Sequence, residues 1–246
     1  MFSKSAQFYD AIYEWKDYKA ESLRLVEIIA ANKKSPGGSL LDVACGTGAH
    51  IPYLRDSYAI EGVDLNPSML EIARSKNPGI PFHRCDMVNL DLGRQFDVVV
   101  SLFSSIGYVS TNERLALAVR NMARHVLPGG VLIIEPFFSP AAWKPRTPGV
   151  NIVDRPEITI VRMIDWVRES NMVKSVFHYL VGTAKGVEHF TELHEMGLFT
   201  DEEYRISFTA AGMAVTHDEK GLMGRGLYIG TCATAGYDPK RGAGFE

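Results

Sequence analysis

Five short apolar runs alternate with helical stretches in the first 135 residues, and this alternation constrains the fold more than any other feature. The apolar runs are residues 39–44, 59–65, 81–84, 96–103 and 131–135. The helical stretches are residues 18–34, about 50–57, 67–76 and 112–126. Strands that alternate with helices of this length predict βαβ units, and therefore an α/β fold built on a mostly parallel sheet.

The pattern changes after residue 136. Residues 137–199 alternate β-branched and aromatic side chains, which predicts a small antiparallel β insert. Helix returns at 200–212, where Thr200 and Glu203 have the spacing of a capping box. Two closing strands follow at 214–219 and 227–233. We therefore expect a core made of 1–136 and 200–235 with an N-terminal lid, an insert at 137–199 and a loose tail at 236–246.

Composition excludes several classes of protein. The 246 residues are 46% hydrophobic and carry a net charge of only −3, which argues against disorder. The 26 basic and 29 acidic residues leave no excess of positive charge for nucleic acid. No apolar run approaches the roughly 20 residues of a membrane span, and the start lacks the apolar core of a signal peptide. Three isolated cysteines fit a reducing compartment. The sequence predicts a cytoplasmic protein without nucleic-acid or membrane partners.

The first apolar run leads into a turn of small residues, Cys45-Gly46-Thr47-Gly48, and then into a helical stretch. Glycines at such a turn allow a ligand to lie against the main chain. Asp64 ends the second run, 22 residues after Asp42. An acidic residue at about that spacing is placed to accept hydrogen bonds from ribose hydroxyls. The combination predicts a nucleoside site.

The turn departs from the pattern that binds dinucleotides. That pattern has a third glycine three residues beyond the second, but Ile51 stands there and Pro52 follows. A carboxylate at Asp42 would repel a pyrophosphate, whereas it suits a ligand that carries an ammonium group. S-adenosyl-L-methionine combines an ammonium, a sulfonium, ribose hydroxyls and adenine, so it is the cofactor that the residues favour.

These residues resemble the class I S-adenosylmethionine-dependent methyltransferases. The run from Leu41 to Gly48 is similar to motif I of that family, with Ala44 where many members have glycine. Four further motifs follow in order: Asp64-Leu65-Asn66-Pro67-Ser68-Met69-Leu70, Cys85-Asp86-Met87, Phe96-Asp97-Val98-Val99-Val100-Ser101 and Leu127-Pro128-Gly129-Gly130-Val131-Leu132. The resemblance implies a Rossmann-like sheet with an antiparallel closing strand. It also implies that Asp86 meets the adenine amino group while Met87 meets the ring. The cofactor residues expected on this basis are Tyr18, Asp42, Ala44, Cys45, Gly46, Gly48, Asp64, Leu65, Met69, Asp86, Met87, Leu102 and Ser104.

A narrower resemblance covers nearly the whole chain. Several segments are similar to the N,N-dimethyltransferases of deoxysugar biosynthesis: Lys16-Asp17-Tyr18, Phe103-Ser104-Ser105-Ile106-Gly107-Tyr108, Glu135-Pro136-Phe137-Phe138, Phe208-Thr209-Ala210-Ala211-Gly212 and Gly224-Arg225-Gly226-Leu227-Tyr228. It implies that the chain methylates twice the amine of a 3-amino or 4-amino sugar linked to dTDP. The sequence departs from that family at Phe137-Phe138-Ser139-Pro140, which replaces a Trp-rich version, and at 141–151.

The expected acceptor residues are aromatic or basic. An N-terminal lid that includes Tyr9 and Tyr13 would exclude water and surround a sulfonium. Phe137 and Phe138 lie in the acceptor segment. Arg225 stands between two glycines, where its planar guanidinium suits a diphosphate.

The candidate catalytic residues are Tyr108 and His194, as acceptors of a hydrogen bond from the reacting amine. His189 and His194 lie five residues apart in an expected strand and so point to opposite faces, which argues against a metal site. We expect no metal, and we expect Cys45 and Cys85 to pack as small apolar residues.

Three function classes stay open at this point. The first is an amino-sugar N-methyltransferase that acts on a nucleotide-linked small molecule. The second is a methyltransferase for another small amine, hydroxyl or carboxylate. The third is a module that binds S-adenosylmethionine without catalysis. A homodimer is a further open expectation.

Overall fold

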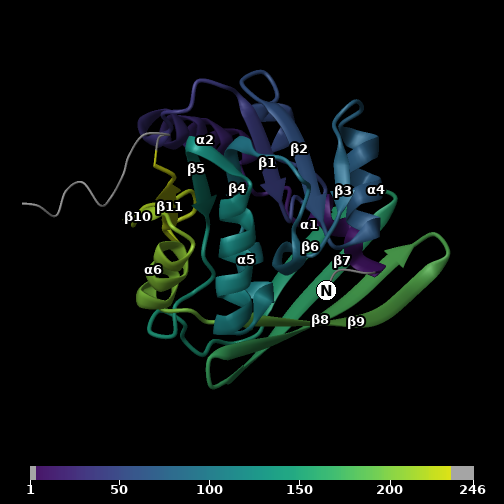
Figure 1. The fold of residues 1–246 in the computed structure, drawn as a ribbon. Coiled ribbons are helices and arrows are strands. Elements are labelled where there is room, and N and C mark those ends of the chain that lie inside the picture. The colour runs from purple at the N-terminus through teal and green to yellow at the C-terminus, as the bar shows by residue number, and fades with distance from the viewer. Residues whose placement is uncertain (1–3, 234–246) are drawn as a thin grey trace, which may run out of the picture.

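A seven-stranded sheet forms the centre of the computed structural model, which describes residues 4–233 (Figure 1). Its strands run in the order β10-β11-β5-β4-β1-β2-β3. They are β1 (Ser39–Val43), β2 (Ala59–Asp64), β3 (Phe82–Arg84), β4 (Phe96–Ser101), β5 (Val126–Ile134), β10 (Ala214–Asp218) and β11 (Leu227–Thr231). The first five pair in parallel, whereas β11 pairs antiparallel with β5 and with β10. The predicted α/β class and its antiparallel closing strand are confirmed.

Helices cover both faces of this sheet. They are α2 (Tyr18–Asn32), α3 (Ile51–Leu54), α4 (Pro67–Lys76), α5 (Asn112–Arg124) and α6 (Asp201–Ala210). Apolar side chains of α2 and α3 share one core with β1, and those of α5 and α6 share another on the opposite face. Side chains fix the helix starts, since Asp17, Asn66 and Thr111 each accept a backbone N–H of the first turn. Thr200 and Glu203 form the predicted capping box.

A second sheet of four antiparallel strands lies across the lower end of the central sheet in Figure 1. Its strands are β6 (Gly149–Arg155), β7 (Ile158–Glu169), β8 (Met172–Thr183) and β9 (Gly186–Gly197), paired in sequence order. Its inner face is buried, while its outer face exposes apolar side chains. The exposed ones include Val150, Ile152, Met163, Leu180 and Val187.

The N-terminal segment joins the core to the insert sheet. It consists of the short 3-10 helix η1 (Lys4–Phe8) and of α1 (Tyr9–Ile12). The Asp10 carboxylate accepts from Thr47 Oγ1 at 2.6 Å and pairs with Lys76, both of the core. On the other side, Ser5 hydrogen-bonds to Glu192 of β9. Within residues 4–233, no helix is long and apolar enough to cross a membrane.

Two elements differ from the sequence prediction by more than two residues at a boundary. The strand predicted at 131–135 begins at Val126, so Leu127–Gly130 form an irregularity inside β5 instead of a turn before it. Gly129 makes this possible with φ of +77°. The helix predicted at about 50–57 has only four residues, because the N–H groups of Ser57 and Tyr58 both donate to Leu54 O and end it. The tail expected at 236–246 lies outside the described residues.

Candidate functional site

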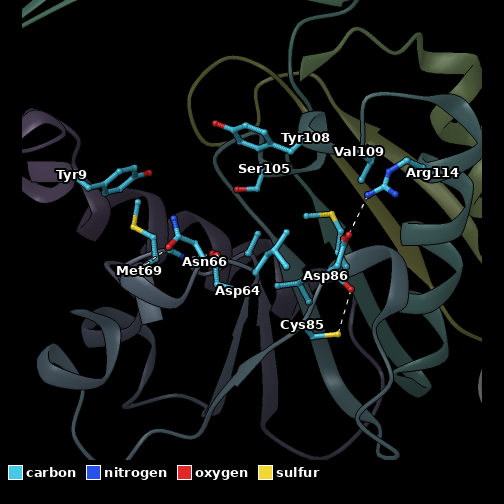
Figure 2. Close-up of a pocket in the computed structure, with 15 residues that line it drawn as sticks. Tyr9, Asp64, Asn66, Met69, Cys85, Asp86, Ser105, Tyr108, Val109 and Arg114 are labelled. Carbon is cyan, nitrogen blue, oxygen red and sulfur yellow. Dashed lines mark hydrogen bonds and ion pairs between the residues drawn. The ribbon is translucent and has the colours of Figure 1, made fainter. Parts of the chain in front are cut away.

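Two adjoining cavities open where β1, β2 and β4 end. The first is lined by Tyr9, Val43, Ala44, Gly46, Asp64, Leu65, Asn66, Met69, Cys85, Asp86, Met87, Ser105, Tyr108, Val109 and Arg114 (Figure 2). The second is lined by Tyr9, Tyr18, Asp42, Ala44, Cys45, Gly46, Thr47, Ala49, His50, Leu102, Phe103 and Ser105. Of the thirteen residues expected to hold the cofactor, eleven line these cavities. Gly48 and Ser104 are the two that do not.

Asp64 holds the turn that separates β1 from α3. Its Oδ2 accepts from Gly46 N and its Oδ1 from Asn66 N, both at 2.8 Å. Burial raises the pKa of Asp64, and these backbone donors partly offset the rise. A carboxylate oxygen accepts more than one hydrogen bond, so both oxygens still have lone pairs for the hydroxyls of a ribose.

Asp42 is a buried carboxylate at the end of β1, with 3% of its surface exposed. Burial, and then the charge of Asp64, raise its pKa to about 7. It lines the second cavity beside Tyr18 and His50. A cationic group in that cavity would stabilise the ionised form of Asp42, whereas an anionic group would be repelled.

The loop after β3 supplies the far wall of the first cavity. Asp86 accepts from Val88 N and from Arg114 Nη2, each at 3.1 Å. Figure 2 shows Asp86 and Arg114 joined across this wall, with Cys85 below. The sequence pattern does not indicate Arg114, because its contact with Asp86 joins a loop to a helix 28 residues away. Asn66, which caps α4, was not among the expected site residues either.

The turn after β1 has an unusual backbone. Ala44 and Gly46 have φ of +61° and +56°, so the main chain curves around the ligand side of the turn. A left-handed conformation is strained for alanine, whereas glycine would adopt it without that strain. Gly48 has a packing role, since a Cβ on it would lie 2.8 Å from Asn77 Nδ2.

A second strained turn follows β4. Phe103 and Ser104 are consecutive non-glycine residues with φ of +53° and +62°. Three hydrogen bonds of 2.7 Å hold them: Phe103 N to Glu135 Oε2, Ser104 Oγ to Pro136 O, and Arg225 Nη1 to Ser104 Oγ. Such conformations cost about 1–3 kcal/mol each and persist where the surroundings enforce them. The turn places Leu102, Phe103 and Ser105 in the wall of the second cavity.

A buried charged cluster packs against the aromatic wall of the second cavity. Lys16, whose side chain is fully buried, forms an ion pair with Glu21. A Glu21 carboxylate oxygen also lies 3.0 Å from His50 Nε2. The Lys16 ammonium lies 4.6 Å from the Phe103 ring centroid and 4.7 Å from that of Tyr18. Burial lowers the pKa of Lys16 and of His50, while their bonds to Glu21 act against it. The cluster fixes the rings of this cavity's wall.

Residues expected on the acceptor side are also brought together. The Tyr9 and Tyr13 rings are 4.6 Å apart, and Tyr13 packs edge-on against Phe103 at 5.2 Å. Tyr108, which lines the first cavity, hydrogen-bonds through its hydroxyl to His194 Nδ1 at 2.7 Å. His194 is 1% exposed, and burial lowers its pKa. As expected from their spacing, His189 lies on the other, exposed face of β9.

A third cavity lies beyond Arg225. It is lined by Pro136, Phe137, Phe138, Ser139, Pro140, Ala141, Ala142, Phe199, Thr200, Asp201, Tyr204, His217, Gly224, Arg225 and Tyr228. The Arg225 guanidinium is 5.4 Å from the Phe138 ring centroid and 5.7 Å from that of Phe103. Arg225 therefore stands between the second cavity, which Phe103 lines, and this aromatic third cavity.

This arrangement fits S-adenosylmethionine. Two carboxylates at neighbouring strand ends, a turn of small residues and an aromatic wall are what its ribose, its ammonium and its sulfonium require. The sequence profile of a methyltransferase domain family matches residues 40–130. Fold and site together define a class I methyltransferase that uses S-adenosylmethionine as its cofactor.

Comparisons over the whole chain narrow the family. The chain is 39% identical to dTDP-3-amino-3,4,6-trideoxy-alpha-D-glucopyranose N,N-dimethyltransferase from Streptomyces venezuelae, over 93% of this chain and 98% of that protein. It is 40% identical to dTDP-3-amino-3,6-dideoxy-alpha-D-glucopyranose N,N-dimethyltransferase from Streptomyces fradiae, over 92% and 89%. The solved structure of Streptomyces venezuelae DesVI aligns with a TM-score of 0.87 at 38% identity, over 95% of this chain and 100% of that one. The chain belongs to the family of S-adenosylmethionine-dependent amino-sugar N,N-dimethyltransferases.

Proposed function

We propose that the chain methylates, twice, the amine of an amino deoxysugar that is carried on dTDP. The observation that carries the proposal is the position of Arg225 between the aromatic wall of the cofactor cavity and a separate aromatic cavity. An elongated acceptor with an amine at one end, a diphosphate in the middle and a nucleoside at the other end matches that order. The relatives that match over nearly the whole chain are named for such acceptors.

We propose the following division of roles. Asp64 binds the ribose of the cofactor, Asp42 its ammonium, and Asp86 with Met87 the adenine. Arg225 binds the diphosphate, and its planar fork suits phosphate oxygens. Phe137 and Phe138, with the third cavity behind them, take the nucleoside. The insert of residues 137–199 selects the acceptor, and the core at 1–136 and 200–235 holds the cofactor.

S-adenosylmethionine, when bound, supplies a methyl group that is already activated on a positively charged sulfur. The protein has to hold the amine in line with that group and exclude water. Tyr9, Tyr13 and Phe103 form the aromatic boundary that does so. Tyr108 accepts a hydrogen bond from the amine and orients its lone pair. Burial raises the pKa of Tyr108, so the hydroxyl is neutral and can donate to His194.

Kinetics with dTDP-linked 3-amino and 4-amino sugars test the proposal. Arg225→Ala should raise the KM for the acceptor more than tenfold, because a charge-assisted contact contributes about 1.5–3 kcal/mol. The affinity for S-adenosylhomocysteine should fall less than that for the acceptor, since Glu135 and Pro136 O still hold the turn at Phe103 and Ser104. Tyr108→Phe should mainly lower kcat. Arg120→Ala is a control, since Arg120 is exposed on α5 and lines none of the three cavities.

Two results would oppose the proposal. One is an Arg225→Ala enzyme with the parental KM for every nucleotide sugar that it methylates. The other is activity confined to acceptors without phosphate, which would favour a methyltransferase of another small amine, hydroxyl or carboxylate.

A further inference from the structure

A buried carboxylate, Glu192, lies behind the proposed catalytic pair. It sits on β9 two residues before His194, so both side chains point to the inner face of the insert sheet. Glu192 is 7% exposed and His194 1%. A charge is costly in such surroundings unless partners compensate it. The groups that stabilise the Glu192 charge therefore indicate the role of this residue.

Glu192 has polar partners on two sides. From the N-terminal segment, Ser5 N donates to Oε1 at 3.2 Å and Ser5 Oγ to Oε2 at 2.5 Å. From its own strand, His194 Nε2 lies 3.8 Å from Glu192 Oε2. The Ser5 contacts fix the carboxylate, so that it faces the far side of the His194 ring.

The near side of that ring faces Tyr108. His194 Nδ1 is 2.7 Å from the Tyr108 hydroxyl, and Phe177 stacks on the imidazole at 4.2 Å. A neutral phenol donates its proton to Nδ1, which leaves the proton of a neutral imidazole on Nε2, toward Glu192. Tyr108, His194 and Glu192 thus follow one another from the first cavity into the insert, with a hydrogen bond between the first two and ion-pair distance between the last two.

Burial and a neighbouring positive charge disfavour a protonated His194 ring, and Glu192 is the group that favours it. Arg162 of β7 is 3% exposed and its positive charge lowers the pKa of His194, as burial does. Among the described residues, Tyr108 of η3 (Ser105–Val109) also faces the ring, and Tyr179 of β8 lies within electrostatic reach of Glu192; both are neutral phenols. Glu192 opposes these influences, because its carboxylate favours the charged ring.

We propose that Glu192 is a positioning residue of the methyl-transfer reaction, which fixes the Nε2–H form of His194 and stabilises its imidazolium. The inference rests on the proposed roles of Tyr108 and His194. In the proton transfer, an N–H bond of the acceptor ammonium breaks and an O–H bond forms on Tyr108. The original O–H bond of Tyr108 breaks and an N–H bond forms at His194 Nδ1. The electron pairs stay on the atoms that lose the proton, and the amine gains the lone pair that attacks the methyl group.

Nitrogen-15 NMR of histidine-labelled enzyme tests the proposal without any acceptor. In the parent enzyme we expect the neutral His194 ring to carry its proton on Nε2. In Glu192→Gln, the pH at which His194 becomes protonated should fall by at least about one unit, which is a tenfold change in proton affinity. Glu195→Gln is the matched control, because Glu195 is exposed on the other face of the same strand. That control should leave the His194 signals unchanged.

Kinetics provide the second readout. Glu192→Gln should lower kcat about tenfold or more, and it should leave both KM values within twofold of the parent. A parent enzyme whose neutral His194 carries the proton on Nδ1 would overturn the inference even if the variant fails to fold. An unchanged His194 titration in a folded Glu192→Gln would overturn it as well. Failure of the nucleotide-sugar proposal would leave the NMR result intact, so the two failures are distinguishable.

Discussion

At the residue scale, the cofactor site depends on carboxylates that the sequence pattern identifies. Asp42 and Asp64 end adjacent parallel strands, and β1 pairs with β2 in a register that places Asp42 opposite Gly62. Ends of adjacent parallel strands meet at one edge of a sheet, so a local motif suffices to predict their proximity. The charge of Asp64 adds to the effect of burial in raising the pKa of Asp42.

The pKa of Asp42, about 7, predicts a pH-dependent cofactor affinity. Because a cationic ligand favours the ionised carboxylate, the affinity for S-adenosylmethionine should fall as pH decreases below 7, by up to tenfold per pH unit. Asp42→Asn should bind more weakly at pH 8 and lose that dependence. Calorimetry on both proteins from about one and a half pH units below the transition to about one unit above it measures the effect. A parental affinity independent of pH would contradict the assigned role.

The raised pKa of Asp42 also makes the free energy of unfolding depend on pH. Ordinary aspartate in an unfolded chain titrates near 3.9, so between about pH 4 and pH 7 the cofactor-free native state binds more protons than the unfolded state. The contribution of Asp42 to stability is therefore present below pH 4 and is lost as pH rises toward 7. Bound cofactor should remove this loss, because it compensates the charge.

Other residues of the site have no signal in a single sequence. Arg114 reaches Asp86 from a helix, and Arg162 donates to Tyr13 from a strand 149 residues away. Glu192 meets Ser5 over 187 residues. The contacts of Arg162 and Glu192 depend on how the insert packs on the N-terminal segment. Periodicity predicts which face of β9 is buried, but it does not predict which side chain lies opposite.

At the element scale, the turn after β4 connects the second cavity, which Phe103 lines, to Arg225 in the wall of the third cavity. Its left-handed residues Phe103 and Ser104 belong to a segment that resembles the family, but the sequence does not reveal their backbone strain. Residues other than glycine seldom adopt positive φ, so residue propensities do not predict this turn. The elements themselves were predictable, because α4 and the capped α6 follow local periodicity and capping. The bulge in β5 was not, because it depends on pairing with β4.

Glu135 should control this turn. It is 0% exposed, and its Oε2 accepts from Phe103 N. Glu135→Leu leaves that N–H without its acceptor, so the free energy of unfolding should fall by about 1–3 kcal/mol. Affinity for S-adenosylhomocysteine should fall too, because Phe103 would move. Denaturant unfolding and calorimetry measure both effects.

Glu135→Gln is the control for the Glu135→Leu variant, since its amide oxygen still accepts from Phe103 N. It should keep most of the cofactor affinity. A folded Glu135→Leu protein with the parental affinity would show that the turn holds its shape without the carboxylate.

At the scale of the whole molecule, the outer face of the insert sheet leaves many large apolar side chains uncovered: Val150, Ile152, Met163, Val167, Leu180, Val187 and Leu193. Ile152, Val161 and Leu180 form one row across β6, β7 and β8. Ile152 is 65% exposed and Leu180 47%. Apolar patches of this kind mark interaction surfaces. The expected homodimer and the cytoplasmic location stay predictions.

Lysine substitutions test whether the homodimer uses this face. We expect the parent enzyme to sediment as a dimer and the double variant Ile152→Lys, Leu180→Lys to sediment as a monomer, because burying two charges on each partner is costly. Leu23→Lys is the control, since Leu23 is exposed on α2. A monomeric parent, or a double variant that remains a dimer, would contradict this interface.

The strand order has a consequence for synthesis of the chain on the ribosome. β5 is complete at residue 134, yet its neighbour β11 begins only at residue 227. Between them the chain encodes four strands that pair in sequence order, so their contacts are local and form quickly. The nascent protein therefore presents an unpaired edge of β5 while the intervening residues are translated. Such an edge invites pairing with other chains, which makes this interval the point at which aggregation competes with folding.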